Sequence, residues 1–275
     1  MAVFLNDRFL ENEAALLHAS DLSMQRGYAL FDFFRTVKGI PLFPEDHLNR
    51  FYASAAAMHL PVSYSGEEIM QIVQTLIRRS YLSEAGIRLM LTGGYSANGY
   101  TPASPNLLIT CQPVKTATTA DFEKGYSILT YEHQRELPHI KSINYLTAVW
   151  LQPLLKEKGV DDVLYYHQNK ITEFPRCNVF IVTPEQKLAT PAVGMLAGVT
   201  RKNVLSLAST RMPVEERDIS LNELMNASEV FLTATTKKII PVCTINGQKV
   251  GAGKPGPVTT CLYEQFIQLE QSLTQ

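Results

Sequence analysis

In DVLYYHQNKITEFPRCNVFIVTPEQKLATP, residues 162–191, short apolar runs alternate with turn-forming residues. The run DVLYYH is followed by a turn at 168–170 and then by ITEF, and both runs have the length and composition of β-strands. In NVFIVTPEQKLATP the segment TPEQ separates two apolar runs, which is typical of a hairpin turn. This region is therefore predicted to form consecutive strands.

Helical periodicity is found on both sides of this strand region. Residues 144–157 carry apolar side chains at helical spacing, and the pattern stops at Gly159, although Pro153 interrupts it. Further on, a helix is predicted at 200–210, followed by a strand VFLTATT and by a terminal helix after Pro257. The second half of the chain is thus predicted to be mixed α and β.

The first part of the chain, residues 2–112, combines strand-like segments with two helices. One helix is predicted around 45–60 from its apolar spacing. The other begins with Ser65 and Glu68 in an S-x-x-E pattern, which predicts a capping box. The runs IRLMLTGG and PNLLITCQ are separated by a Gly, Ser, Asn and Pro segment, and we expect them to pair as a hairpin with a long loop.

A change in composition divides the chain in two. Residues 114–125, VKTATTADFEKG, are polar and rich in threonine, which is common between domains. We therefore predict a small N-terminal domain at 1–113, a connector at 114–125 and a larger C-terminal domain at 126–275. The fold class is mixed α/β, with two domains that meet at a cleft, where ligands commonly bind.

Composition limits the kinds of partner. The chain has 275 residues, 45% of them hydrophobic, and a formal net charge of -1. Without a long basic run, binding to nucleic acid or to an anionic membrane is not expected, and small molecules are the favoured partners. No leader peptide and no run of about 20 apolar residues is found, so we expect a cytoplasmic protein. Four cysteines without CxxC spacing predict neither a metal site nor a disulfide framework.

Three features could carry chemistry, although each has an ordinary explanation when taken alone. Lys141 lies beside apolar residues, and a reactive lysine has to be desolvated or placed near positive charge, yet most lysines are solvated. Glu173 lies at the end of a predicted strand, where an acid is often a rim residue. The segment GVTRK at 198–202 opens a helix, and helix N-termini bind anions but are usually simple caps.

The order of these features along the chain is more informative than any one of them. IKSINYL at 140–146, ITEFPRCNVFIV at 171–182 and AGVTRKNVLSLA at 197–208 together resemble the signature region of class IV aminotransferases. RGYALFDFFRTVKGIPLFPEDHLNRF at 26–51 and TATTKKIIPV at 233–242 are also similar to segments of that family. The resemblance implies a fold-type IV enzyme that uses pyridoxal 5′-phosphate, with two α/β domains, an active site in the cleft and a homodimeric assembly.

The resemblance also implies roles for individual residues. Lys141 matches the catalytic lysine that binds the cofactor covalently, and Glu173 matches the acid that pairs with its pyridine nitrogen and keeps it protonated. Arg50 matches the phosphate-binding arginine, and Tyr145 is similar in place to a tyrosine near the phenolic oxygen. Backbone amides and hydroxyls of four further residues are implied to bind the phosphate: Val199, Thr200, Thr235 and Thr236.

Substrate recognition departs from the commoner patterns of the family. The Arg-x-His pair that binds carboxylates in many D-amino acid transaminases is replaced by GGYS at 93–96. Arg26, Arg88 and Arg176 instead resemble the arginines of a less common D-amino acid transaminase branch. Guanidinium groups bind carboxylates bidentately, which suits amino acids and 2-oxo acids. Arg88 lies within the apolar run AGIRLML, where strand alternation predicts that it shares a face with Gly86 and Met90.

The resemblance implies a two-stage transamination between a D-amino acid and a 2-oxo acid such as 2-oxoglutarate. The freed amine of Lys141 is expected to move a proton at the substrate α-carbon. Two alternatives remain within the family, namely a branched-chain L-amino acid aminotransferase and a 4-amino-4-deoxychorismate lyase. A protein that binds the cofactor without turnover is a third alternative, which the presence of both Lys141 and Glu173 disfavours.

Overall fold

The computed structural model describes residues 2–274, and contacts divide them into two units. The first unit contains the chain up to Lys115 together with Ile140–Asn144 and Thr274, and the second contains Thr116–His139 and Tyr145–Leu273. The segment Ile140–Asn144 thus has its contacts with the first unit although it lies well beyond the predicted connector. The domain limits derived from the sequence, 113 and 126, stay predictions.

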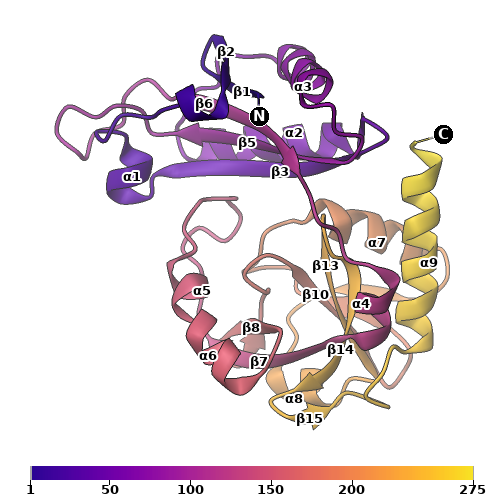
Figure 1. Ribbon diagram of the computed structural model, residues 1–275. Coiled ribbons are helices and arrows are strands. Elements are labelled where there is room, and N and C mark those ends of the chain that lie inside the picture. Colours follow the sequence, from indigo (N-terminus) through magenta and orange to yellow (C-terminus); the bar gives the residue numbers. More distant parts are fainter. Residues whose placement is uncertain (1, 275) are drawn as a thin grey trace. The chain divides into compact units, whose positions relative to one another are not determined.

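The first unit is built on a six-stranded sheet with the order β2-β1-β6-β5-β3-β4, in which all neighbours are antiparallel. Helices α2 (Pro44–Ala57) and α3 (Gly66–Ser80) cover one face of it, as Figure 1 shows, and enclose a hydrophobic core. Its strands are β1 (Ala2–Leu5), β2 (Arg8–Glu11), β3 (Ala29–Val37), β4 (Ile40–Pro41), β5 (Ala85–Thr92) and β6 (Leu107–Pro113), with a short 3-10 helix η1 (Asn12–Ala14) and helix α1 (Leu22–Arg26) between β2 and β3.

Local signals in the first unit are confirmed. Helix α3 begins with the predicted capping box, because the Ser65 hydroxyl accepts from the Glu68 N–H while the Glu68 carboxylate accepts from the Ser65 N–H. The predicted hairpin also forms, since β5 and β6 pair antiparallel along their length. Arg88 lies on the same face of β5 as Gly86 and Met90, as the period-two alternation predicts.

The second unit is built on a nine-stranded sheet with the order β12-β11-β10-β13-β14-β7-β8-β9, and β15 pairs with β14. The pairs β14–β7, β7–β8 and β11–β12 are parallel, whereas the other neighbours are antiparallel. The strands are β7 (Tyr126–Glu132), β8 (Asp162–His167), β9 (Lys170–Ile171), β10 (Asn178–Val182), β11 (Leu188–Thr190), β12 (Val214–Glu216), β13 (Glu229–Ala234), β14 (Lys238–Ile245) and β15 (Gln248–Lys249).

Helices α7 (Val199–Ser209) and α9 (Pro257–Ser272) pack against each other and against β13 in the second unit (Figure 1). Both were predicted, as was the hairpin that joins β10 to β11. The shorter helices are α4 (Thr119–Lys124), α5 (Leu146–Trp150), α6 (Gln152–Lys158) and α8 (Leu221–Met225). Within residues 2–274, no helix is both long and apolar enough to cross a membrane.

The helix predicted at 144–157 is two helices. Helix α5 ends at Trp150 and α6 begins at Gln152, so Pro153 lies within the first turn of the second helix. Proline lacks the N–H that a helix interior needs, but it is accommodated at a helix start. The predicted stop is confirmed, because Gly159 caps α6 in the left-handed conformation with φ 63°.

Candidate active site

Lys141 is held by backbone contacts with the start of β3. The Phe31 N–H donates to the Lys141 carbonyl at 2.9 Å, and the Ile143 N–H donates to the Ala29 carbonyl at 3.1 Å. These bonds give the segment a short strand-like pairing, although it lies outside the sheet. Lys141 lies in the loop from 133 to 145 that joins β7 to α5, and Ser142 in this loop bridges to Leu30 of β3.

The amine of Lys141 and the guanidinium of Arg88 lie against the same aromatic ring. The Lys141 Nζ is 4.6 Å from the centroid of the Phe31 ring, and the Arg88 Cζ is 4.9 Å from it. Arg88 also lies over Phe33, at 5.9 Å. Among residues 2–274, Arg88 makes no hydrogen bond or ion pair, so its N–H groups are available to a ligand. A primary amine and a guanidinium group therefore contact the same aromatic ring.

Arg50 takes part in a buried ionic network in the first unit. Its Nε and Nη2 donate to the two carboxylate oxygens of Asp32 at 2.8 and 2.9 Å, and the Nδ1 of His47 lies 2.7 Å from the same carboxylate. Although burial acts to raise it, the charge of Arg50 and hydrogen bonds from both partners hold the pKa of Asp32 far below its ordinary value. Burial lowers the pKa of His47, which favours the neutral imidazole. Arg50 is thereby fixed in position.

Glu173 is the centre of a second buried network, which lies in the second unit. The Arg135 Nε donates to Oε1 of Glu173 at 2.6 Å, and the Leu196 N–H donates to Oε2 at 3.0 Å. The Arg135 Nη2 donates in turn to the Pro138 carbonyl at 2.8 Å. The two charged side chains are only 12% and 6% exposed. The carboxylate of Glu173 is thus held in one orientation. The sequence did not predict this pairing, because no motif or periodicity distinguishes Arg135 from the other polar residues of its loop.

The start of α7 lacks a side-chain cap. Its N-cap, Gly198, offers no side-chain acceptor and the first turn has no acidic residue, whereas α3, α4 and α8 each have a capping side chain. A Cβ on Gly198 would overlap the Oδ1 of Asn178, whose Nδ2 donates to the Leu196 carbonyl at 2.7 Å. Leu196 therefore joins the start of α7 to Glu173. Val199 and Thr200, the first two helical residues, are buried.

Thr235 and Thr236 lie in the turn between β13 and β14. Near this end of β13, Thr233 pairs with Asn178 at the start of β10. The Thr233 hydroxyl is buried and has no partner among the described residues. The threonine turn therefore follows the end of β13 that pairs with Asn178. Asn178 in turn contacts Gly198, the N-cap of α7. The start of α7 and the turn at Thr235 and Thr236 therefore both lie near Asn178 in the second unit.

Tyr145 and Arg176 lie close to the Glu173 network. Burial raises the pKa of Tyr145, and the charges of Arg135, Glu173 and Arg176 also act on its phenol. Arg176 is exposed in a tight turn that is closed by a 2.9 Å bond from the Phe174 N–H to the Cys177 carbonyl. The third predicted arginine, Arg26, ends α1 in the first unit, where its exposed side chain donates to a neighbouring backbone carbonyl.

The predicted residues therefore fall into two groups, each described within its own unit. The second unit presents a buried carboxylate that accepts from Arg135 and from the Leu196 N–H, together with a helix start that lacks a side-chain cap. This donor set fits a cofactor that has a protonated ring nitrogen and a phosphate. In the first unit, a lysine against an aromatic ring fits covalent attachment to an aldehyde. The first unit holds Arg26, Arg50, Arg88 and Lys141, and the second holds Tyr145, Glu173, Arg176, Val199, Thr200, Thr235 and Thr236.

A two-unit α/β chain with this donor set is typical of fold-type IV enzymes, and comparison with known proteins agrees. Residues 29–245 match the family model for class IV aminotransferases. The chain belongs to the class IV aminotransferase family, as its signature segments predicted. These enzymes use pyridoxal 5′-phosphate and act on small molecules, so the predicted family, fold class and cofactor are confirmed.

Individual relatives carry two kinds of specific name. A D-alanine aminotransferase of Bacillus licheniformis is 29% identical over 269 residues, covering 94% of this chain and 93% of the relative. The branched-chain amino acid aminotransferase of Escherichia coli superimposes with a TM-score of 0.90 at 26% identity, covering 98% and 94% of the two chains. A hypothetical aminotransferase from Mycobacterium tuberculosis, solved in its PLP-bound form, has the same fold, with a TM-score of 0.85 at 21% identity and coverage of 98% of both chains.

Proposed function

We propose that this aminotransferase transfers the amino group of a D-amino acid to a 2-oxo acid such as 2-oxoglutarate, and that Lys141 binds the cofactor. The observation that carries the proposal is that the Lys141 amine and the Arg88 guanidinium both contact the Phe31 ring, at 4.6 and 4.9 Å from its centroid. Because Arg88 makes no hydrogen bond or ion pair among residues 2–274, its N–H groups can bind the substrate carboxylate close to the amine that acts on the α-carbon. The curated D-alanine aminotransferases among the relatives support the preference for the D configuration.

The bound cofactor would supply an electron sink that acidifies the α-hydrogen of the substrate. Glu173 would keep the pyridine nitrogen protonated, because its own charge is fixed by Arg135 and by the Leu196 N–H. Lys141, when it is neutral, would carry the proton to and from the α-carbon. Tyr145 would donate to the phenolic oxygen. The phosphate would be bound by Arg50 and by the backbone and hydroxyls of Val199, Thr200, Thr235 and Thr236.

Arg26 and Arg176 would complete recognition of the substrate carboxylates. Both guanidinium groups are exposed, as ligand-binding groups have to be before substrate enters. A cytoplasmic homodimer is part of the same proposal, and in it Arg26 would serve the neighbouring subunit. Its support is an apolar patch on α5, where three large side chains stand 66% to 78% exposed at helical spacing. These side chains are Leu146, Val149 and Trp150.

The decisive experiment compares amino donors with 2-oxoglutarate as acceptor. D- and L-alanine and D- and L-glutamate are assayed separately, and we expect turnover with the D enantiomers. Lys141→Ala should lose turnover and the absorbance of the covalently bound cofactor, while Lys124→Ala, at an exposed lysine of the second unit, should keep both. An active Lys141→Ala enzyme would rule out the proposed role of this lysine.

Branched-chain transamination is the second candidate, because the solved structures that superimpose closely include branched-chain enzymes. A preference for L-leucine over D-alanine in the same assay would establish it. Arg26, Arg88 and Arg176 favour the D-amino acid transaminase over the branched-chain enzyme, since a pocket for branched apolar side chains needs fewer charged groups. Release of pyruvate from 4-amino-4-deoxychorismate would instead identify the lyase.

A further inference from the structure

We infer that Phe33 is a positioning residue for substrate recognition, because its ring, with that of Phe31, forms an aromatic shelf that orients the guanidinium of Arg88. Gly86 leaves the space that this arrangement requires. The inference rests on the proposed function, in which Arg88 binds the substrate carboxylate. It adds two residues, Phe33 and Gly86, that would decide how well Arg88 performs this role.

The shelf is built by the pairing of two neighbouring strands. In the antiparallel pair β3–β5, Phe33 lies directly opposite Arg88, and Arg35 lies opposite Gly86. Phe31 and Phe33 are two residues apart in β3 and so point to the same face of the sheet. The Arg88 Cζ lies 4.9 Å from the Phe31 centroid and 5.9 Å from the Phe33 centroid, within the range of cation–π contacts.

The glycine next to Arg88 on this face makes room for the Phe33 ring. A Cβ on Gly86 would lie 2.6 Å from Cζ and 2.7 Å from Cε2 of Phe33, closer than carbon atoms approach in folded proteins. The obstructing atoms are the far end of a side chain, whereas the nearest other atom, the Cβ of Val114, is 3.4 Å away. An alanine at 86 would therefore displace the ring of Phe33 and leave the backbone in place.

The chemical consequence follows from the shape of a guanidinium group. A guanidinium that contacts a ring through its flat face keeps the N–H donors at its edge available for a carboxylate in its plane. Among the described residues, Arg88 makes no hydrogen bond or ion pair, and its guanidinium contacts the rings of Phe31 and Phe33. Without the shelf, the long side chain would sample several rotamers and bind a carboxylate less tightly.

Phe31 and Phe33 should differ in one respect. The ring of Phe31 also contacts the amine of Lys141, at 4.6 Å, whereas no such contact exists for Phe33 among residues 2–274. Replacing Phe31 would therefore disturb both groups. Phe33 acts on Arg88 alone, which makes it the better position for a test.

The test measures binding of an unreactive dicarboxylate, succinate, and of its uncharged analogue succinamide to the cofactor-loaded enzyme. Dissociation constants are obtained from the ligand-dependent rise in melting temperature. Phe33→Leu and Gly86→Ala should weaken succinate binding about threefold to tenfold and leave succinamide unchanged, a loss expected for cation–π contacts of this kind. Phe33→Tyr keeps an aromatic ring and should bind succinate within about twofold of the parent enzyme.

A matched control separates positioning from loss of stability. At Gly66, the first residue of α3, an added Cβ would have only Leu48 Cδ1 nearby, at 3.7 Å, so Gly66→Ala should leave both affinities unchanged. A purely structural effect of Phe33→Leu would lower the melting temperature without ligand and keep the succinate-to-succinamide ratio. An unchanged ratio in Phe33→Leu and Gly86→Ala would overturn the inference.

The same measurement on Arg88→Leu distinguishes the inference from the proposed function. If Arg88→Leu loses the preference for succinate while Phe33→Leu keeps it, Arg88 binds carboxylates without the shelf, and only the inference fails. If the parent enzyme binds succinate no better than succinamide, or if Arg88→Leu keeps the preference, the proposed role of Arg88 fails and the inference falls with it.

Discussion

Two arginine–glutamate pairs in the second unit look alike in contact geometry but differ in surroundings. Arg135 and Glu173 are paired in the interior, where their side chains are 12% and 6% exposed. Arg217 and Glu223 are paired near the surface, at 35% and 30%. In the buried pair, the carboxylate of Glu173 lies near the uncapped start of α7. In the surface pair, both side chains belong to a network of charged groups that bind one another.

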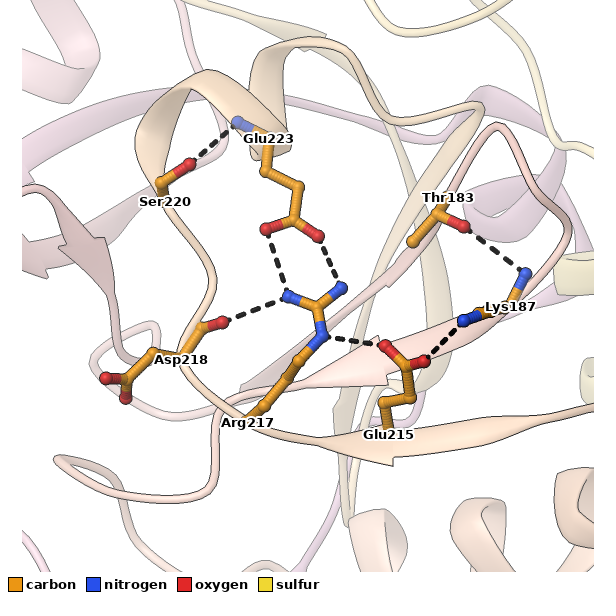
Figure 2. Close-up of polar contacts among 7 residues, drawn as sticks. All are labelled: Thr183, Lys187, Glu215, Arg217, Asp218, Ser220 and Glu223. Carbon is orange, nitrogen blue, oxygen red and sulfur yellow. Dashed lines mark hydrogen bonds and ion pairs between the residues drawn. The ribbon is translucent and has the colours of Figure 1, made fainter.

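Figure 2 shows how complete the surface network is. The guanidinium of Arg217 faces both oxygens of Glu223 and donates through Nε to Glu215 at 2.7 Å. Glu215 also accepts from the Nζ of Lys187 at 2.9 Å. Hydrogen bonds and charges of Arg217 and Lys187 lower the pKa of Glu215, and the bonds to Glu223 and Glu215 raise that of Arg217. Glu215 and Arg217 are therefore charged at neutral pH.

Ion-pair geometry alone does not identify a functional site. Water screens the surface network, so its net contribution to folding is small. The interior pair costs desolvation, and removal of one partner leaves the other charged in a medium that solvates it poorly. A buried, oriented carboxylate next to an uncapped helix start is the combination that a cofactor can use.

The largest effect should come from breaking the interior pair. Arg135→Met would leave Glu173 buried without its cation and should lower the free energy of unfolding by about 3–5 kcal/mol. Urea denaturation monitored by circular dichroism would measure it. The double variant Arg135→Met/Glu173→Gln removes both charges and should recover part of the loss. A loss below about 1 kcal/mol in the single variant would show that the interior is well hydrated there.

A second large effect should come from Asp32, the buried partner of Arg50. Its folded-state pKa lies below the unfolded value of about 3.8, so its stabilisation is present above that pH and is lost as the pH falls below it. Asp32→Asn should cost about 2–4 kcal/mol at pH 7 and flatten the decline of stability in acid. Unfolding free energies measured from about pH 7 to about pH 2 would show this. Parallel curves for the two proteins would contradict the assignment.

The surface network should respond weakly. Arg217→Ala should lower the free energy of unfolding by about 1 kcal/mol or less, and most of this loss should disappear in about 1 M NaCl. Urea denaturation at low and high salt would measure both quantities. The loss caused by Arg135→Met should persist in high salt, because buried charges are screened much less. Equal salt sensitivity of the two variants would remove the distinction between the pairs.

The smallest effect is expected for a single pair at the surface. Lys170 and Asp218 form an ion pair at 56% and 47% exposure. Lys170→Ala should change the free energy of unfolding by less than about 0.5 kcal/mol, within the usual range for surface substitutions. A thermal unfolding scan against the parent enzyme suffices. A loss as large as that of Arg217→Ala would mean that the single pair is as effective as the network.

Sequence patterns determined much of the local structure. The capping box at Ser65, the hairpin of β5 and β6, and the stop at Gly159 all depend on neighbours within a few residues, and such short-range signals can be read from the chain. The ordered motifs around Lys141 and Glu173 likewise pointed to the family. At Pro153 the periodicity was misleading, because a continuous pattern of apolar residues predicted one helix where the structure has two.

Tertiary structure alone decided the surroundings of those motif residues. Arg135 pairs with Glu173 across 38 positions of the chain, and Lys141 is held by the start of β3. Arg88 meets two rings of another strand. Contacts of this kind depend on strand register and loop paths, which leave no periodic trace near either partner. The sequence determined which chemical groups are present, and packing decided which of them are charged, oriented and open to a ligand.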